Sequence, residues 1–148
     1  MPPQLKRALA TTIAVVLSTG LTACAGSPSG DTPAEKAAIS LVEALTSGDG
    51  KTACPLMTPK FLAAVKADME DSGWDEETDG TCEGYVKLTS ELVAGHGGLQ
   101  VKAVTSTTTS AGTAEVVVRS KGQPDNGYVV KKVGTAWLVD EHIDSDDY

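Results

Sequence analysis

Hydrophobic residues recur at helical spacing in the stretch that follows residue 31. The segment from Thr32 to Glu35 (Thr-Pro-Ala-Glu) has the form of a capping box with proline at the first helical position. Gly48 is suited to end this helix, because glycine readily adopts a left-handed conformation. The apolar positions that share one face are Ala38, Leu41, Val42 and Leu45. The pattern therefore predicts a helix that begins at Pro33 and ends before Gly48.

Two further stretches repeat the helical pattern. The pair Thr58-Pro59 is a second helix-start signal, and Gly73 follows as a stop. The third stretch covers residues 83–94. The residues expected to face inward are Phe61, Leu62, Val65 and Met69 in the second helix and Tyr85, Leu88 and Leu92 in the third. A short helical turn is expected over Lys51 to Met57.

From Leu99 onward, threonine and valine dominate, and the pattern favours strands over helices. Four strands are predicted: Val101–Ser106, Thr113–Ser120, Tyr128–Val133 and Ala136–Ile143. The short turns between them, over residues 107–112, 123–127 and 134–135, favour an antiparallel meander. Because helices come first and strands follow, we expect an α+β domain. Its helices should pack on one face of a four-stranded, mostly antiparallel sheet.

The first residues have the order of a secretory signal peptide. Lys6 and Arg7 are followed by an apolar run and then by small residues before Cys24. The alternative is a transmembrane helix. The uncharged stretch from Ala8 to Ala23 is shorter than the roughly 20 apolar residues that a span requires, and it contains several serine and threonine residues. The pattern therefore favours export.

The segment Leu21-Thr22-Ala23-Cys24 resembles the lipobox of bacterial lipoproteins. The resemblance implies cleavage after residue 23, a diacylglyceryl thioether on Cys24, and a fatty acyl group such as palmitate on the new amino terminus. Such chains hold a protein on a membrane, because each buried CH₂ contributes about 0.8 kcal/mol. The expected location is the outer face of the cell membrane. The expected organisation is a signal peptide over 1–23, a lipid-anchored tether over 24–32, and one domain with an acidic tail over 33–148.

The composition narrows the classes of function. The chain has 148 residues, which fits one domain, and a formal net charge of −8. An acidic chain with only 4% aromatic residues is poorly suited to bind nucleic acid through phosphates or through base stacking. We therefore expect no nucleic-acid partner.

The three cysteines divide into two groups. If Cys24 carries lipid, Cys54 and Cys82 remain, and an exported protein is in a place where disulfides persist. We expect these two to pair, the alternative being two independent buried thiols. The cysteines and histidines lack the spacing of a zinc or thioredoxin-like site, so neither a metal nor a cofactor is expected.

The acidic run from Glu70 to Glu83 raises the question of calcium. Asp75 to Gly80 resembles the first half of an EF-hand loop, but Val86 occupies the position that requires a bidentate glutamate. The alternative is a solvated acidic loop between helices. We favour this alternative because the set of calcium ligands is incomplete.

A second resemblance covers most of the mature chain. Ser47-Gly48-Asp49 after the first helix, the start Thr58 to Phe61, and the strand Gly134 to Asp140 resemble nuclear transport factor 2-like domains. The positions of Cys54 and Cys82 are similar to those in small lipoproteins of high-GC Gram-positive bacteria. The resemblance implies a curved sheet wrapped over helices as a cone, with a pocket between them. The exposed sheet face of such domains often dimerises, so the resemblance is compatible with a homodimer.

Enzymes of that superfamily, such as ketosteroid isomerase, use aspartate and tyrosine groups inside the cone. The candidate pocket residues in this chain are Tyr85, Tyr128, Trp137, Asp140 and His142. The alternative is that the aromatic residues only fill core space. No catalytic motif of the family maps onto this chain. We therefore expect a non-catalytic domain that binds an envelope protein or a small apolar ligand. The second hypothesis is a small cone-fold enzyme, isomerase- or dehydratase-like, acting on an apolar ligand.

Overall fold

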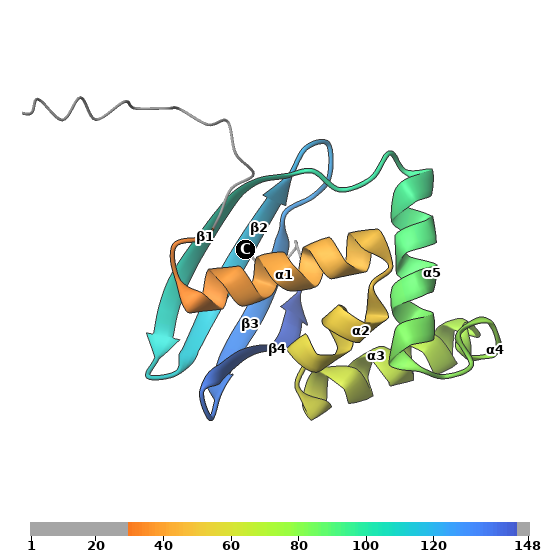
Figure 1. Cartoon of the computed structure of the whole chain (residues 1–148), viewed down its shortest axis with the longest axis horizontal. Coiled ribbons are helices and arrows are strands. Elements are labelled where there is room, and N and C mark those ends of the chain that lie inside the picture. Colours follow the sequence, from red (N-terminus) through yellow and green to blue (C-terminus); the bar gives the residue numbers. More distant parts are fainter. Residues whose placement is uncertain (1–29, 145–148) are drawn as a thin grey trace, which may run out of the picture.

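A computed structural model describes residues 30–144 of the chain. The helices are α1 (Pro33–Ser47), α2 (Gly50–Ala53), η1 (Cys54–Leu56), α3 (Pro59–Ser72), α4 (Asp75–Thr78) and α5 (Cys82–Gly95). The strands are β1 (Val101–Ser110), β2 (Thr113–Ser120), β3 (Asn126–Val133) and β4 (Ala136–Ile143). Each strand pairs antiparallel with the next, in the order β1-β2-β3-β4, so the sheet is open. The predicted α+β class with a four-stranded antiparallel sheet is confirmed (Figure 1).

Several sequence expectations lie outside the described residues. These are the signal peptide over 1–23, the lipidation of Cys24, most of the tether, and the last four residues of the acidic tail. Within residues 30–144, no helix combines the length and the apolar character that a membrane span needs.

The start of α1 follows the predicted capping box. The backbone N–H of Glu35 donates to Thr32 Oγ1 at 3.2 Å, and Glu35 Oε2 accepts from the backbone N–H of Thr32 at 2.9 Å. The other oxygen, Oε1, accepts from Ser106 Oγ on β1 at 2.6 Å. Burial disfavours the charged form of Glu35, but these hydrogen bonds outweigh it and lower its pKa. Glu35 therefore completes the capping box of α1 and also joins α1 to β1 of the sheet.

The core lies between α1 and one face of the sheet (Figure 1). The helix presents the predicted apolar face, and alternate residues of the strands meet it, as the two-residue period of a strand requires. The fully buried members of this core include Ala38, Leu41, Val86, Val116, Val118, Val130 and Val139. Burying each valine or leucine contributes roughly 1.5–3 kcal/mol, so this layer is the main source of stability.

Two details of the prediction are wrong. The expected loop 107–112 is mostly strand, because β1 continues to Ser110 and its threonine-rich end pairs with β2. In α5, Leu92 was expected inward but is 46% exposed, whereas the unpredicted Val86 is fully buried. Gly84 lies in close contact with Thr78 of α4, and the spacing of apolar residues in α5 could not reveal that contact.

The predicted disulfide is confirmed. Cys54 in η1 and Cys82 at the start of α5 are bonded, with Cα atoms 6.0 Å apart. Both side chains are half-buried against the core. The bond joins the start of α5 to η1, and α5 supplies part of the wall of the site described next.

Candidate functional site

A β-bulge in β4 positions Asp140. Val130 of β3 pairs with Val139, and Val129 pairs with Glu141, so Asp140 is an extra residue without a partner across the strand pair. Its side chain is nine-tenths or more buried at the edge of the sheet. There the chain preceding α3 runs beside β4, and the backbone N–H of Thr58 donates to the carbonyl of Val139 at 2.8 Å.

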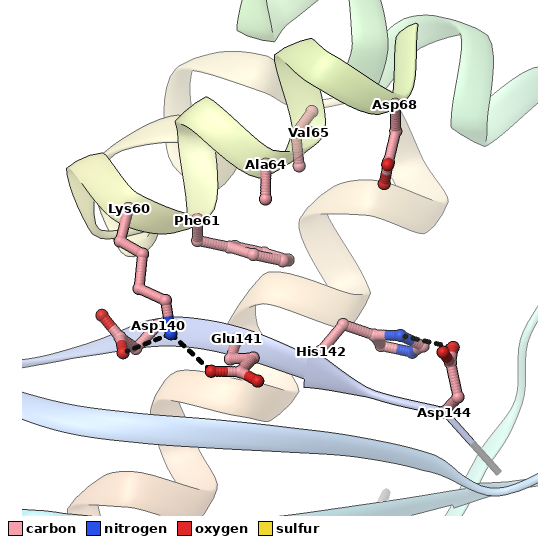
Figure 2. Close-up of a pocket in the computed structure, with 9 residues that line it drawn as sticks. All are labelled: Lys60, Phe61, Ala64, Val65, Asp68, Asp140, Glu141, His142 and Asp144. Atoms are coloured by element: carbon pink, nitrogen blue, oxygen red, sulfur yellow. Dashed lines mark hydrogen bonds and ion pairs between the residues drawn. The ribbon is translucent and has the colours of Figure 1, made fainter. Parts of the chain in front are cut away.

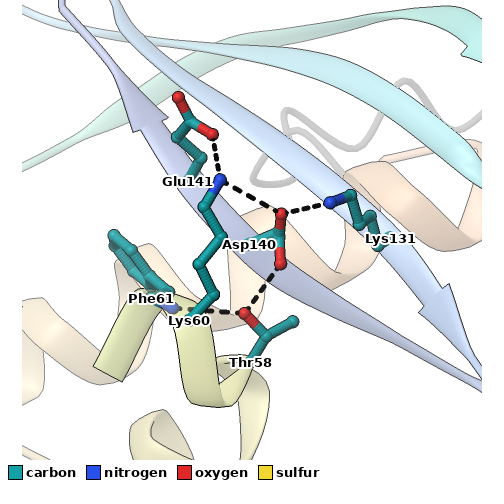
Figure 3. Close-up of polar contacts among 6 residues, drawn as sticks. All are labelled: Thr58, Lys60, Phe61, Lys131, Asp140 and Glu141. Carbon is teal, nitrogen blue, oxygen red and sulfur yellow. Dashed lines mark hydrogen bonds and ion pairs between the residues drawn. The ribbon is translucent and has the colours of Figure 1, made fainter. Parts of the chain in front are cut away.

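The Asp140 carboxylate is held by three side chains (Figure 3). Thr58 Oγ1 donates to Oδ1 at 2.9 Å, while Lys131 Nζ and Lys60 Nζ lie 2.5 and 3.6 Å from Oδ2. Lys60 also pairs with Glu141. Burial of Asp140 disfavours its charged form, but the contacts with Lys131 and Thr58 and the two lysine charges outweigh burial and lower the pKa. Asp140 is therefore a carboxylate at neutral pH, and it joins α3 to β4.

An outer pocket of about 340 Å³ opens between α3 and β4 (Figure 2). One wall is the face of α3 that begins at Lys60 and Phe61, and the other is the end of β4. The lining residues are Lys60, Phe61, Ala64, Val65, Asp68, Asp140, Glu141, His142 and Asp144. Charged groups of both signs therefore surround it.

An inner pocket of about 270 Å³ lies deeper, among α1, α3, α5 and β3. Its walls are mainly aliphatic and aromatic. The lining residues are Val42, Leu45, Phe61, Val65, Asp68, Tyr85, Thr89, Val93, Leu99, Asn126, Tyr128 and His142. The two pockets share Phe61, Val65, Asp68 and His142, so they meet at this boundary.

Aromatic polar side chains form part of the inner wall. Tyr128 and His142 contact edge to face, with ring centroids 5.4 Å apart. His142 Nε2 lies 3.5 Å from Asn126 Oδ1, and its Nδ1 lies 3.6 Å from Asp144 Oδ1. Desolvation raises the pKa of Tyr85; its hydrogen bond with Thr89 acts against this, and the negative charge of Asp68 adds to it. Tyr85 is therefore a neutral phenol at neutral pH.

The structure separates the residues that the sequence grouped as one candidate pocket. Tyr85 and Tyr128 line the inner pocket, with His142 at its boundary. Asp140 lines only the outer pocket. Trp137 lines neither of these pockets; it is half-buried against the core, on β4 opposite Lys132.

Sequence reasoning missed the contribution of α3. Phe61, Val65 and Asp68 line both pockets, and their spacing of four and then three residues places them on one helical face. Phe61 and Val65 were expected to face inward, but as core residues. The signal that could have identified Asp68 was an acidic residue at the next position of that apolar face.

The acidic segment 70–83 does not form an EF-hand loop. Asp75–Thr78 is a turn of helix, α4, and its last residue, Thr78, is buried. Across residues 30–144, the acidic, histidine and cysteine side chains form no cluster of three or more that could hold a metal ion. The calcium interpretation therefore has no geometric support in this part of the chain.

The arrangement is suited to hold a small molecule that has an apolar part. Aliphatic and aromatic walls line the inner pocket, and Lys60, His142 and four carboxylates line the outer pocket. The chain matches no known protein-family model, no curated protein and no solved structure.

Proposed function

We propose that this chain is an exported lipoprotein whose domain binds a small, mainly apolar ligand at the outer face of the cell membrane. The lipid on Cys24 is the proposed anchor, with residues 24–32 as the tether and 33–148 as a nuclear transport factor 2-like domain. The single observation that carries the binding role is the inner pocket, with its aliphatic and aromatic walls. Its volume is close to the lower end of the range for small-ligand sites, about 300 Å³.

Binding is favoured over catalysis by where the titratable groups lie. An isomerase of the related kind needs a carboxyl and a phenol that converge on the same ligand. Here Tyr85 and Tyr128 line the inner pocket, but Asp140, the aspartate predicted to act with them, lies outside it, and its carboxylate is occupied by Thr58, Lys131 and Lys60. Asp68 does line this pocket, but it is exposed at the boundary with the outer pocket, whereas the carboxyls of such isomerases lie in an apolar interior. An engaged, ionised carboxylate outside the pocket is a poor general acid.

Export is supported by the disulfide and by the amino-terminal pattern. A disulfide between Cys54 and Cys82 persists in an oxidising environment and is rare in the cytosol. The lipobox-like segment ends at Cys24, whose thiol is the group that lipoprotein processing modifies. The two observations point to the same compartment independently.

The anchor is tested by expressing the full chain in a Gram-positive host and measuring the mass and membrane fraction of the product. We expect a chain that begins at Cys24 and carries diacylglycerol, and a Cys24→Ser variant that is neither lipidated nor cleaved after residue 23. Recovery of the parent chain with residues 1–23 and without lipid would overturn the anchor.

The pocket is tested by titrating the full chain, in a non-ionic detergent, with benzyl alcohol as a small apolar probe. We expect saturable shifts of the Val65 and Leu99 methyl signals in NMR spectra. Val93→Phe should fill the inner pocket and weaken binding, whereas Leu92→Phe, one position away and exposed, should not. Absence of saturable binding, or equal binding by both variants, would overturn the binding role.

A further inference from the structure

We propose that the ligand of this site is a small organic cation, with its apolar body in the inner pocket and an ammonium group beside Asp68. The inference rests on the proposed function and names the chemical class of its ligand. Three independent features support it: the position of Asp68, the balance of charge around it, and the aromatic walls.

Asp68 stands where the two pockets meet. It lines both of them, and Figure 2 shows its carboxylate extending from α3 toward the sheet. Asp68 is exposed to solvent, and among residues 30–144 no side chain forms a hydrogen bond or ion pair with its carboxylate. The carboxylate shares the inner pocket with Tyr85, whose pKa its negative charge helps to raise. A bound cation would supply the counter-charge that the protein does not.

The remaining charges leave the opening negative. Asp140 is matched by Lys131, and Glu141 by Lys60. Asp68 and Asp144 are then the carboxylates of the outer pocket that no lysine of residues 30–144 pairs with. His142 is the basic group near Asp144. An anionic ligand would be repelled here. A neutral ligand would remove part of the water around the Asp68 carboxylate and offer no charge in its place.

The aromatic residues favour the same ligand class. Phe61, Tyr85 and Tyr128 line the inner pocket, and aromatic rings attract cations through the negative charge of their faces. The attraction is stronger where the cation is partly desolvated, as it would be between these pocket walls. An ammonium group on an apolar body therefore satisfies the carboxylate and the rings together.

The experiment compares three probes of the same size: benzylammonium, benzyl alcohol and benzoate. Each is titrated into the full chain in non-ionic detergent at pH 7, and the dissociation constant is read from the Val65 and Leu99 methyl signals. We expect benzylammonium to bind about 3- to 5-fold more tightly than benzyl alcohol, as for a partly exposed charge pair, and benzoate to bind most weakly. Asp68→Asn should abolish the preference.

The matched control is Asp71→Asn, an exposed aspartate of the same helix that lines neither pocket. It should retain the preference for benzylammonium, which excludes a general effect of net charge. If benzyl alcohol binds but benzylammonium binds no better, or if both variants behave alike, the cation inference is wrong while the proposed function stands. If benzyl alcohol does not bind either, the proposed function itself fails.

Discussion

Thr58 Oγ1 donates a hydrogen bond of 2.9 Å to Asp140 Oδ1, which joins two residues that are 82 positions apart in the chain (Figure 3). The same oxygen accepts from the backbone N–H of Phe61 at 3.2 Å and so caps α3. One hydroxyl group therefore fixes the start of α3 against the bulge of β4. Because Phe61 is the first residue of α3 to line both pockets, this contact also sets one wall of the site.

The first prediction concerns the charge at this junction. Asp140→Asn keeps an oxygen that can accept from Thr58 but leaves Lys131 without its buried counter-charge. We expect the free energy of unfolding to fall by about 1–2 kcal/mol, measured by urea denaturation. Glu141→Gln is the matched control, because Glu141 is exposed and its ion pair is with exposed Lys60. Its urea midpoint should stay close to that of the parent, and an equal loss in both variants would contradict the proposed role of the bulge.

The second prediction concerns acid. The pKa values of Glu35 and Asp140 are lowered from 4.5 and 3.8, respectively, so below about pH 5 the unfolded chain binds more protons than the folded one. Their contribution to stability is therefore complete at neutral pH. It is lost as the pH falls through these ordinary values toward the lowered ones.

Urea denaturation between pH 7 and pH 3 measures this effect. Glu35→Gln should reduce stability at pH 7 and flatten the acid limb of the curve. Glu43→Gln, an exposed change on the same helix, should leave the shape of the curve unchanged. A Glu35→Gln curve parallel to the parent at every pH would show that the carboxylate contributes nothing that depends on ionisation.

Local chemistry made much of the fold predictable. The capping box at Thr32 and the left-handed Gly48 were evident, because caps are decided by residues within one turn. The four strands followed from the threonine and valine pattern and from turn residues such as Gly112 and Gly134. These signals depend on neighbours in sequence, which is why a single sequence carries them.

The site depends on contacts between distant segments. The bulge at Asp140 arises from the register of β4 against β3, and its burial depends on Thr58. Gly84 of α5 lies against Thr78 of α4, and α5 buries Val86 and exposes Leu92. Periodicity within one helix contains no information about either contact.

The third prediction concerns the disulfide. Removing the cross-link with Cys54→Ser and Cys82→Ser together should lower the free energy of unfolding by roughly 3–4 kcal/mol, the value that the chain-entropy model gives for a loop of this length. The loss should also loosen α5, which carries Tyr85 and Val93 of the inner pocket. Thermal unfolding and binding of benzyl alcohol measure the two effects.

Chemical reduction of the parent protein is the control for that variant. Reduced parent and double variant should unfold alike, because both lack the same cross-link. In the oxidised parent, neither Cys54 nor Cys82 should react with an alkylating reagent before unfolding. Rapid alkylation of both thiols in the native exported protein would rule out the bond.

The fourth prediction concerns the close approach of α5 to α4. A Cβ added at Gly84 would lie 2.0 Å from the carbonyl oxygen of Thr78, a backbone atom that cannot move aside without shifting α4. We expect Gly84→Ala to lower the free energy of unfolding by about 1–3 kcal/mol. Gly95→Ala, in the same helix, meets no atom within 4 Å and should be neutral or slightly stabilising, because alanine is the better helix former. Thermal denaturation of the two variants separates steric contact from helix propensity, and a tolerated Gly84→Ala would contradict a tight contact between α5 and α4.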